Sequence, residues 1–354
     1  MNSPLDTHAT PTRSWPNEDL EHLGSCPLCG EPERALLYDL LEDRLFRIAP
    51  GTWQLWRCGS CGCAHLDPRP TRESIGAAYR RYFPRHAEPE RMPTQRLEDA
   101  RERLRRGYLN SRYGYSLHHA SRFGAAVLPL FPKRRWNAAL MVRGLPKPPG
   151  RPRLLDVGFG DASFLRFMDA AGWDAAGLEV DQAAVSAARS AGLQVAVGTL
   201  EDALYEPESF DAITLSHVIE HLHDPVGSLQ ACFRLLRGNG VLWLATPNLD
   251  SPGHRRFGRH WFGLDPPRHL VLFDLRTIDQ TLRKAGFVEI RHTRTYRAEL
   301  VLAGSEALAT KRDATSSQTP VSPKLRRLAR LFDLAAAVHP KFGEELVAVA
   351  RKPA

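Results

Sequence analysis

The segment from 154 to 181 has the residue types and spacing needed to hold a polar ligand at the edge of a sheet. Gly158 and Gly160 stand between an apolar run and an amphipathic stretch. Glycine at such a place permits a sharp turn and the close approach of a ligand, and the first turn of the helix that follows suits a polar or anionic group. Glu179 comes about twenty residues later, at the end of the next expected strand, where a carboxylate can accept hydrogen bonds from ribose hydroxyls.

Two details favour S-adenosylmethionine (SAM) over a dinucleotide as that ligand. A dinucleotide-binding motif would have glycine at its sixth position, and this chain has Ser163 there. Asp156, two residues before the first glycine, could take the ammonium group of a cofactor that carries an amino acid, directly or through water. NAD binding, or a turn whose glycines serve only packing, are the alternatives.

His217, Glu220 and His221 form a second group of reactive side chains, just after the strand expected at 210–216. They would lie one helical turn apart, beyond the sheet edge and near the methyl group of SAM. In one interpretation His221 is a general base that takes the proton of a methyl acceptor. In another, Glu220 and His221 bind a divalent metal that lowers the pKa of a hydroxyl. In the third, these histidines only cap the helix or bond to the backbone.

The loop after the strand expected at 241–246 carries aromatic and basic residues. It contains Trp261 and Arg268. Aromatic side chains with a few polar tips suit the wall of a small-molecule pocket. Arg268 could hold a phosphate or carboxylate of the acceptor, or it could form a salt bridge with a neighbouring acid.

Four cysteines near the N-terminus have the spacing of a zinc site. They form two Cys-x-x-Cys pairs, each followed by glycine: Cys26 and Cys29, then Cys58 and Cys61. Such pairs supply four thiolates to a tetrahedral zinc with no open position, so we expect a structural zinc that takes no part in catalysis. Cys63 is a fifth thiol that could compete as a ligand.

Short apolar runs alternate with amphipathic stretches from Arg153 onward, which indicates parallel strands connected by helices. We expect strands at 153–157, 173–180, 194–197, 210–216, 241–246, 288–295 and 345–350, and helices at 162–171, 181–191, 225–236, 277–285 and 324–338. The polar stretch at 310–323 is expected to be disordered.

The composition is that of a globular protein, with 354 residues, 43% hydrophobic and 25% charged, and a net charge of +8. Residues 101–147 hold eleven Lys and Arg residues and one acid, Glu102, so the net charge of this segment exceeds that of the whole chain. This charge could serve nucleic acid, anionic lipid or a phosphorylated substrate, or be a solvated helical face. The chain has neither a long apolar run nor a secretory signal, so we expect a cytoplasmic protein without a transmembrane segment.

Four motifs in order resemble those of class I SAM-dependent methyltransferases: Asp156-Val-Gly158-Phe-Gly160, Gly177-Leu-Glu179-Val-Asp181, Ser209-Phe210-Asp211-Ala-Ile and Gly240-Val-Leu-Trp-Leu. The resemblance covers 153–296 and the last strand. It implies an α/β fold, a seven-stranded Rossmann-like sheet whose last strand is antiparallel, with SAM across the carboxyl ends of the first strands. It also implies that Leu200 covers the adenine, that Glu201 or Asp202 accepts from the adenine amine, and that Ala162 stands where a third glycine is common.

The Glu220-His221 pair is similar to that of metal-dependent members, the small-RNA 2′-O-methyltransferases and the ubiquinone-pathway O-methyltransferases. Those families also use a later histidine, for which His269 is the candidate here, and they carry glutamate where this chain has His217. The loop around Trp261 and Arg268 resembles methyltransferases of bacterial polysaccharide and natural-product pathways. Similar zinc modules precede methyltransferase domains in sugar-pathway enzymes.

We therefore expect a mobile, disordered tail at 1–24, a zinc-ribbon module at 25–70, a helical Arg-rich segment at 71–147, a linker at 148–152 and a methyltransferase domain at 153–354 with an insertion at 298–343. The expected function is methyl transfer from SAM to a hydroxyl of a small molecule such as a sugar or saccharide intermediate. The alternative is an RNA-binding or RNA-modifying protein that uses the zinc ribbon and the basic segment. Peripheral contact with an anionic membrane or a glycolipid is a further partner that the charge allows.

Overall fold

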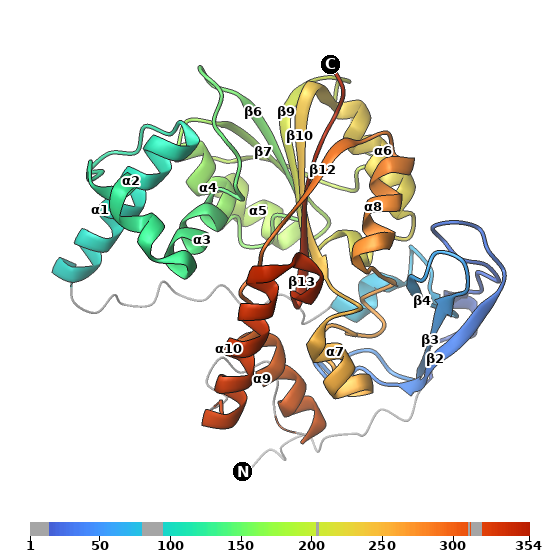
Figure 1. The fold of residues 1–354 in the computed structure, drawn as a ribbon. Helices are drawn as coiled ribbons and strands as arrows, with labels where there is room; N and C mark the ends of the chain where they lie inside the picture. The colour runs from blue at the N-terminus through green and yellow to red at the C-terminus, as the bar shows by residue number, and fades with distance from the viewer. Residues whose placement is uncertain (1–13, 80–94, 203–204, 311, 313–320) are drawn as a thin grey trace, which may run out of the picture.

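A seven-stranded sheet forms the centre of the computed structural model, which describes residues 14–79, 95–202, 205–310, 312 and 321–354 (Figure 1). The strand order is β12-β13-β10-β9-β6-β7-β8. All neighbours from β10 to β8 run parallel, and β13 is antiparallel to both β10 and β12. The predicted fold class is confirmed. The strands are β6 Arg153–Val157, β7 Asp174–Glu179, β8 Gln194–Val197, β9 Phe210–Ser216, β10 Leu236–Pro247, β12 Val288–Thr293 and β13 Glu345–Arg351.

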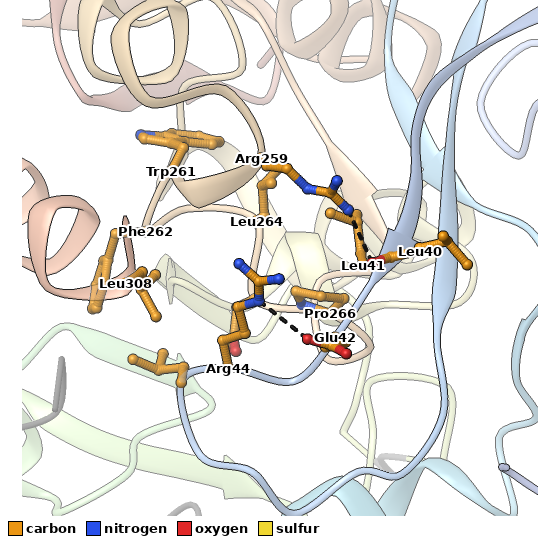
Figure 2. Close-up of a pocket in the computed structure, with 12 residues that line it drawn as sticks. Leu40, Leu41, Glu42, Arg44, Arg259, Trp261, Phe262, Leu264, Pro266 and Leu308 are labelled. Atoms are coloured by element: carbon orange, nitrogen blue, oxygen red, sulfur yellow. Dashed lines mark hydrogen bonds and ion pairs between the residues drawn. The ribbon is translucent and has the colours of Figure 1, made fainter. Parts of the chain in front are cut away.

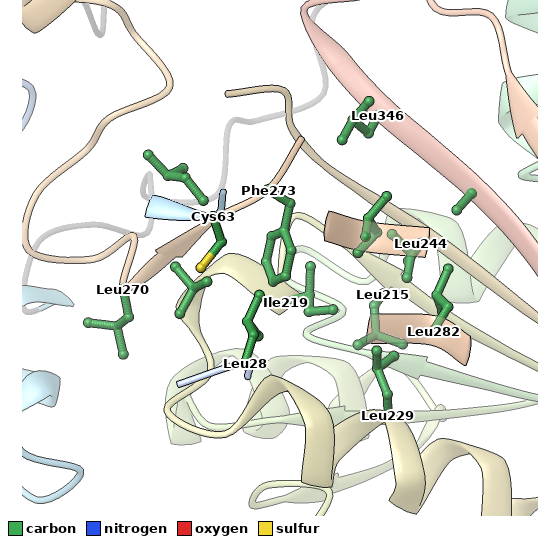
Figure 3. Close-up of a cluster of buried hydrophobic side chains, with 14 of the residues drawn as sticks. Leu28, Cys63, Leu215, Ile219, Leu229, Leu244, Leu270, Phe273, Leu282 and Leu346 are labelled. Atoms are coloured by element: carbon green, nitrogen blue, oxygen red, sulfur yellow. The ribbon is translucent and has the colours of Figure 1, made fainter. Parts of the chain in front are cut away.

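Helices cover both faces of this sheet, and each face has its own apolar core. Helices α4 Ser163–Ala170 and α5 Gln182–Ser190 lie on one face, and α6 Pro225–Leu235 and α8 Leu275–Lys284 lie on the other (Figure 1). Successive side chains of β6 point to opposite faces of the sheet. Leu154 packs with the first pair of helices, and Leu155 packs with the second pair. The second core continues into the N-terminal module through Leu28 and Cys63 (Figure 3).

The N-terminal module shares a sheet with a segment far along the chain. Strands β2 Arg34–Leu41, β3 Trp53–Cys58 and β4 Ala64–Leu66 are joined by β11 Val271–Leu272, in the order β11-β4-β3-β2. The backbone N–H of Leu66 also donates to the carbonyl of Leu270 at 3.0 Å. The predicted module boundary at residue 70 therefore missed one strand, because a strand of two residues has no pattern of its own.

Residues 14–24 differ from the expected mobile tail. Trp15 is buried and packs edge-on against Trp53, with ring centroids 5.6 Å apart. The short strands β1 Leu20–Glu21 and β5 Arg69–Pro70 then pair in antiparallel fashion. Burial of the Trp15 ring ties this stretch to the module. Residues 1–13 of that expected tail, and most of the stretch at 310–323, lie outside the described residues.

Helical elements account for the rest of the described chain. The Arg-rich segment contains η2 Ile75–Tyr79, α1 Gln95–Tyr113, α2 Gly124–Val127, η3 Leu128–Leu130 and α3 Pro132–Met141, and the later chain adds η4 Ile219–His221, α7 Pro252–Phe257, α9 Ala298–Ala309 and α10 Pro323–Val338. Helices α1 and α2 cross at Gly107 and Gly124, where a Cβ on Gly107 would lie 1.8 Å from the Ser121 carbonyl oxygen. Among the described residues, none of the helices is long and apolar enough to cross a membrane.

Candidate functional site

The glycine turn after β6 has the backbone shape that cofactor binding requires. Gly158 and Gly160 have φ of +67° and +56°, and Ala162 keeps the same left-handed conformation at φ +58° although it has a side chain. A Cβ on Gly158 would lie 2.5 Å from Val218 Cγ2, whereas one on Gly160 would meet nothing within 4 Å. Space for a ligand therefore lies beside Gly160.

Glu179 ends β7 directly beside that turn. Its Oε2 accepts from the N–H of Gly160 at 3.1 Å, and its Oε1 accepts from Val180 at 2.8 Å and Asp181 at 3.3 Å. These bonds fix the orientation of a buried carboxylate whose oxygens keep further lone pairs for a ligand. The geometry fits the ribose hydroxyls of SAM.

Asp156 is fully buried, and its partners come from the protein. Thr214 donates to Oδ1 at 2.8 Å, and Arg143, just after α3, forms an ion pair with the same oxygen. The Arg143 guanidinium also stacks on Phe164, 3.6 Å from the ring centre. Oδ2 of Asp156 has no partner among the described residues, so this is the atom that could take the ammonium group of the predicted cofactor, directly or through water.

The residues expected near the adenine follow β8. Leu200 is buried, whereas Glu201 and Asp202 are exposed. Glu201 accepts from the Ser228 hydroxyl at 2.8 Å, and Asp202 accepts from Thr199 at 2.7 Å. Which of the two acids meets the adenine amine stays a prediction, since both already have a hydroxyl partner.

Glu220, His221 and His269 converge beyond the end of β9. One ligand atom from each lies within 4.8 Å of the others, which is the spacing of a possible metal site. The first two lie on η4, and His269 belongs to the loop before β11. The rings of His221 and His269 meet edge-on with centroids 4.7 Å apart. The fold thus brings together residues that are about fifty positions apart in the chain, as the resemblance implied.

Backbone carbonyls fix the orientation of both imidazoles. Nδ1 of His221 lies 2.9 Å from the carbonyl oxygen of Arg268, and Nδ1 of His269 lies 2.8 Å from that of Gly263. A carbonyl only accepts, so each Nδ1 carries the proton and each Nε2 is left with a lone pair. Metal-binding histidines are commonly oriented this way. Oε2 of Glu220, a fully buried carboxylate, has no partner in the described part of the chain.

His217 orients this cluster and contributes no atom to it. Its Nδ1 lies 3.2 Å from Glu220 Oε1 and its Nε2 2.9 Å from Glu345 Oε2. Burial opposes the charge on His217, but these carboxylates outweigh it and raise the pKa to about 10. Burial also opposes the negative charge of Glu220. The bond to His217 outweighs this effect of burial and lowers the pKa of Glu220 to about 2. At neutral pH His217 is therefore a cation between two carboxylates.

His221 is neutral at neutral pH. Burial, reinforced by His269, lowers the pKa of His221 to about 4. Its Nδ1 also lies 3.0 Å from the hydroxyl of Tyr79 on η2. An imidazole with so low a pKa is unprotonated and available as a ligand, but it is a weaker base than a free imidazole, whose pKa is about 6.5.

Arg268 is wholly buried and is held by carboxylates from two parts of the chain. Its guanidinium donates to Asp265 at 2.6 Å and to Asp43 at 2.5 Å, and it reaches the carbonyl of Ala78 at 3.1 Å. Burial opposes its charge, but Asp265 and Asp43 outweigh this and raise the pKa of Arg268 further. Of the two roles considered from sequence, this geometry matches the salt bridge and does not match an anion receptor open to an acceptor.

A narrow hollow lies between the module and the loop that carries Trp261. Its wall includes Leu41, Arg44, Trp261 and Pro266 (Figure 2). Trp261 is almost fully buried, so only an edge of its ring is available as the predicted pocket wall. Arg259 donates to the carbonyl of Leu40 at 3.0 Å, which closes one side of the hollow.

The predicted cysteine ligands also come together. Cys26, Cys29, Cys58 and Cys61 place their sulfur atoms within 4.8 Å of one another, with Cys26–Cys61 at 3.6 Å and Cys29–Cys58 at 3.5 Å. A tetrahedron with Zn–S bonds of about 2.3 Å has S···S edges of about 3.8 Å, close to these separations. Cys63 lies 3.4 Å from Cys26, so it remains a possible competitor.

Three contributors to the site were missed from sequence: Asp43, Tyr79 and Glu345. Asp43 lies in the loop between β2 and β3, and Glu345 begins the last strand. Neither belongs to a motif, and each reaches the site through tertiary contacts more than a hundred residues apart in the chain. Tyr79 was visible only as one of several aromatics after the cysteine module.

Comparison with known proteins agrees with this fold. Residues 130–292 match a family described as a methyltransferase domain. A stretch of 107 residues is 35% identical to the ubiquinone biosynthesis O-methyltransferase of Hahella chejuensis, covering 28% of this chain and 44% of that protein. The homologue of Xanthomonas oryzae pv. oryzae is 35% identical over 103 residues. The chain thus spans less than half the length of these curated relatives.

Solved structures show similarity at low identity. A SAM-dependent methyltransferase from Archaeoglobus fulgidus is 15% identical, with a TM-score of 0.41 over 69% of this chain and 98% of that one. A Haemonchus contortus phosphoethanolamine N-methyltransferase, solved with S-adenosylhomocysteine, is 19% identical, with a TM-score of 0.41 over 62% of this chain and 53% of that one. The family match thus covers residues 130–292 of this chain, and the sheet has the seven strands and the antiparallel last strand expected from the sequence.

The first prediction concerns Glu179. Glu179→Ala removes the acceptor for two ribose hydrogen bonds, each charge-assisted and worth roughly 1.5–3 kcal/mol. SAM affinity measured by titration calorimetry should fall at least tenfold, since about 1.4 kcal/mol corresponds to one decade. Asp174→Ala at the opposite end of β7, where Asp174 pairs with Arg153, is the matched control and should stay within about twofold of wild type. Equal affinities of the two variants would contradict the cofactor site.

The second prediction concerns the buried ion pair. Asp43→Asn leaves the Arg268 charge short of one carboxylate, and loss of one partner of a buried pair costs about 3 kcal/mol or more. Urea unfolding should show this loss, while Asp39→Asn, an exposed carboxylate on the same module, should change the unfolding free energy by less than about 0.5 kcal/mol. A stable Asp43→Asn protein would show that Arg268 does not hold the module.

Proposed function

We propose that this protein transfers the methyl group of SAM to a hydroxyl oxygen of a small-molecule acceptor, such as a sugar or a related metabolite. One observation carries the proposal: Glu220, His221 and His269 converge at the end of β9. Strands β6 and β9 are parallel neighbours, so this cluster and the Gly158–Gly160 turn lie at the same edge of the sheet. An acceptor held by the cluster would lie beside the cofactor.

The bound cofactor supplies an electrophilic methyl group, and the protein must position an acceptor oxygen and manage its proton. Glu220 Oε2 and the Nε2 atoms of His221 and His269 are the available groups. The acceptor hydroxyl would be oriented against them, and its proton would leave toward this cluster as the oxygen–carbon bond forms and the carbon–sulfur bond breaks.

We further propose that these three residues bind a divalent cation. Two imidazoles oriented by carbonyls and one buried carboxylate oxygen form a ligand set with positions left for an acceptor oxygen. A cation there would lower the pKa of the acceptor hydroxyl. The low pKa of His221 favours this role over that of sole general base, and His217, which replaces the glutamate of the metal-dependent families, serves to orient Glu220.

Oxygen as the methylated atom is supported by the relatives named as O-methyltransferases. The wall of the acceptor site would come from the loop that carries Trp261 and from the N-terminal module, which meet at the hollow in Figure 2. In this proposal the N-terminal module helps to form the acceptor site and takes no part in the chemical step. We propose a structural zinc at Cys26, Cys29, Cys58 and Cys61, on the basis of their sulfur positions.

The third prediction concerns His221. His221→Ala should leave SAM affinity within a few-fold of wild type but slow methyl transfer by roughly 10²–10⁴, since the acceptor proton loses its assistance. Turnover would be followed with labelled SAM over a panel of nucleotide-sugars, glycolipids and phenols. His223→Ala, whose imidazole lies 3.0 Å from the carbonyl oxygen of Pro70 and 3.8 Å from Glu21 Oε1, is the neighbouring control. Near-normal turnover of His221→Ala would exclude a chemical role for this histidine.

The metal hypothesis and the base hypothesis differ in their response to chelation. If the cluster binds a cation, chelation should stop wild-type turnover, added magnesium, manganese or zinc should restore it, and His269→Ala should behave as His221→Ala does. Metal analysis of the chelated protein must show that zinc at the cysteines is retained. Turnover that survives chelation with an unimpaired His269→Ala variant would leave His221 as a base without metal.

The fourth prediction concerns the cysteines. Protein purified with zinc supplied should carry about one tightly held zinc per chain at the four thiolates. Cys29→Ser should lose it and destabilise the module, whereas Cys232→Ser, in α6 and outside the group of four thiols, should keep it. Cys63→Ser should also keep full zinc if Cys63 is not a ligand. Zinc-free wild-type protein would refute the site.

A further inference from the structure

The helical Arg-rich segment exposes large apolar side chains that the proposed reaction does not use. Phe123, Leu130 and Phe131 are all exposed within nine residues, and Leu130 is 74% exposed. They lie at the junction of α2, η3 and α3. Single apolar residues on a surface are ordinary, but several gathered in one place commonly mark a contact site.

Helix α10 exposes a second apolar stripe. Leu331, Leu334 and Val338 lie on one side of the helix by their spacing, and Val338 is 77% exposed. Arg327 and Arg330 are exposed one turn before the stripe. The helix therefore has a buried apolar side against α9 and a second apolar side toward solvent, bordered by cations.

The elements that carry the two apolar groups are neighbours in the fold. Trp136 of α3 packs edge-on against Tyr296, just before α9, with ring centroids 5.4 Å apart. The N–H of Ala298, at the start of α9, donates to Asp333 Oδ1 on α10 at 3.2 Å. Figure 1 shows α3 next to the α9–α10 hairpin. Together the exposed residues of α2, η3, α3 and α10 are called the basic apolar surface below.

Cations without carboxylate partners surround these apolar side chains. No ion pair in the described part of the chain engages Lys133, Arg134 or Arg135. A groove between α1 and α3 adds more positive charge over an apolar floor of Leu104, Val127 and Leu128, and its arginines are Arg101, Arg105, Arg106 and Arg134. Its one acid, Glu102, is already paired with Arg105 and Arg106.

We propose that the basic apolar surface binds an anionic membrane. Leu130, Phe131 and the α10 stripe would enter the headgroup region, while the unpaired arginines and Lys133 neutralise lipid phosphates, as in amphipathic interfacial helices. This inference stands on the surface alone and does not depend on the proposed reaction.

Two other occupants fit these observations less well. RNA would use the cations and the two phenylalanines, but it would leave Leu130, Leu331, Leu334 and Val338 exposed, since aliphatic side chains gain little against phosphates or bases. A second copy of the chain would cover the apolar groups but would bring two strongly positive segments together. An anionic bilayer satisfies the apolar and the charged groups at once.

Sedimentation of the full chain with vesicles tests the proposal. Wild type should bind vesicles of phosphatidylglycerol mixed with phosphatidylcholine at least about tenfold more tightly than vesicles of phosphatidylcholine alone, and added salt should weaken the difference. Arg134→Glu/Arg135→Glu should lower binding to the anionic vesicles at least about tenfold, and Leu334→Ser/Val338→Ser about threefold or more. Circular dichroism and SAM affinity check that both variants are folded.

Arg276→Glu/Arg283→Glu on α8 is the matched control, with the same change of net charge on exposed residues of the opposite face. It should bind anionic vesicles within about twofold of wild type. The proposal is overturned if wild type does not distinguish the two vesicles, or if the α3 and α8 charge variants behave alike. It is also overturned if single-stranded RNA displaces the protein from vesicles when RNA and lipid are present at equal phosphate concentration. A last contrary outcome is that Leu334→Ser/Val338→Ser abolishes a dimer and leaves vesicle binding unchanged.

Discussion

Arg268 carries a positive charge with no exposed surface, and much of the molecule is arranged around the need to neutralise it. An unpaired guanidinium in that position would cost several kcal/mol. Asp265 comes from the same loop, but Asp43 comes from the N-terminal module, more than two hundred residues earlier. The charge is therefore stable only when the module is docked on the loop, and each part holds the other in place.

That constraint also determines the geometry beside the catalytic candidates. The carbonyl of Arg268 accepts from His221, and the guanidinium of Arg268 reaches the carbonyl of Ala78, next to Tyr79, whose hydroxyl lies 3.0 Å from His221 Nδ1. The backbone N–H of Leu270 donates to the carbonyl of Glu220, and the carbonyl of Leu270 accepts from the N–H of Leu66 in the module. The module thus helps to position Glu220 and His221 through its contacts with Leu270 and Arg268.

The charges within the cluster follow from the same burial. A carboxylate as deeply buried as Glu220 needs a cation beside it, and His217 supplies that charge. Nδ1 of His217 faces Glu220, and its Nε2 faces Glu345 of the last strand. His221 and His269 have no such carboxylate bonded to them and keep carbonyl partners, so at least His221 stays neutral. Two histidines four residues apart therefore differ in charge, because His217 is bonded to two carboxylates whereas burial and the neighbouring His269 keep His221 neutral.

The cofactor edge was predictable from sequence, because its parts are local: a strand, a turn that needs positive φ at Gly158 and Gly160, and a carboxylate at the end of the next strand. The two Cys-x-x-Cys pairs and the alternation of strands and helices were predictable for the same reason. The partners Asp43 and Glu345, the strand β11 and the burial of Arg268 were not, because each depends on which distant surfaces meet. The sequence by itself determined which residues could do chemistry and on which element each lies. Only the tertiary structure decided their charge and orientation, since a pKa and a tautomer depend on neighbours that chain order does not reveal.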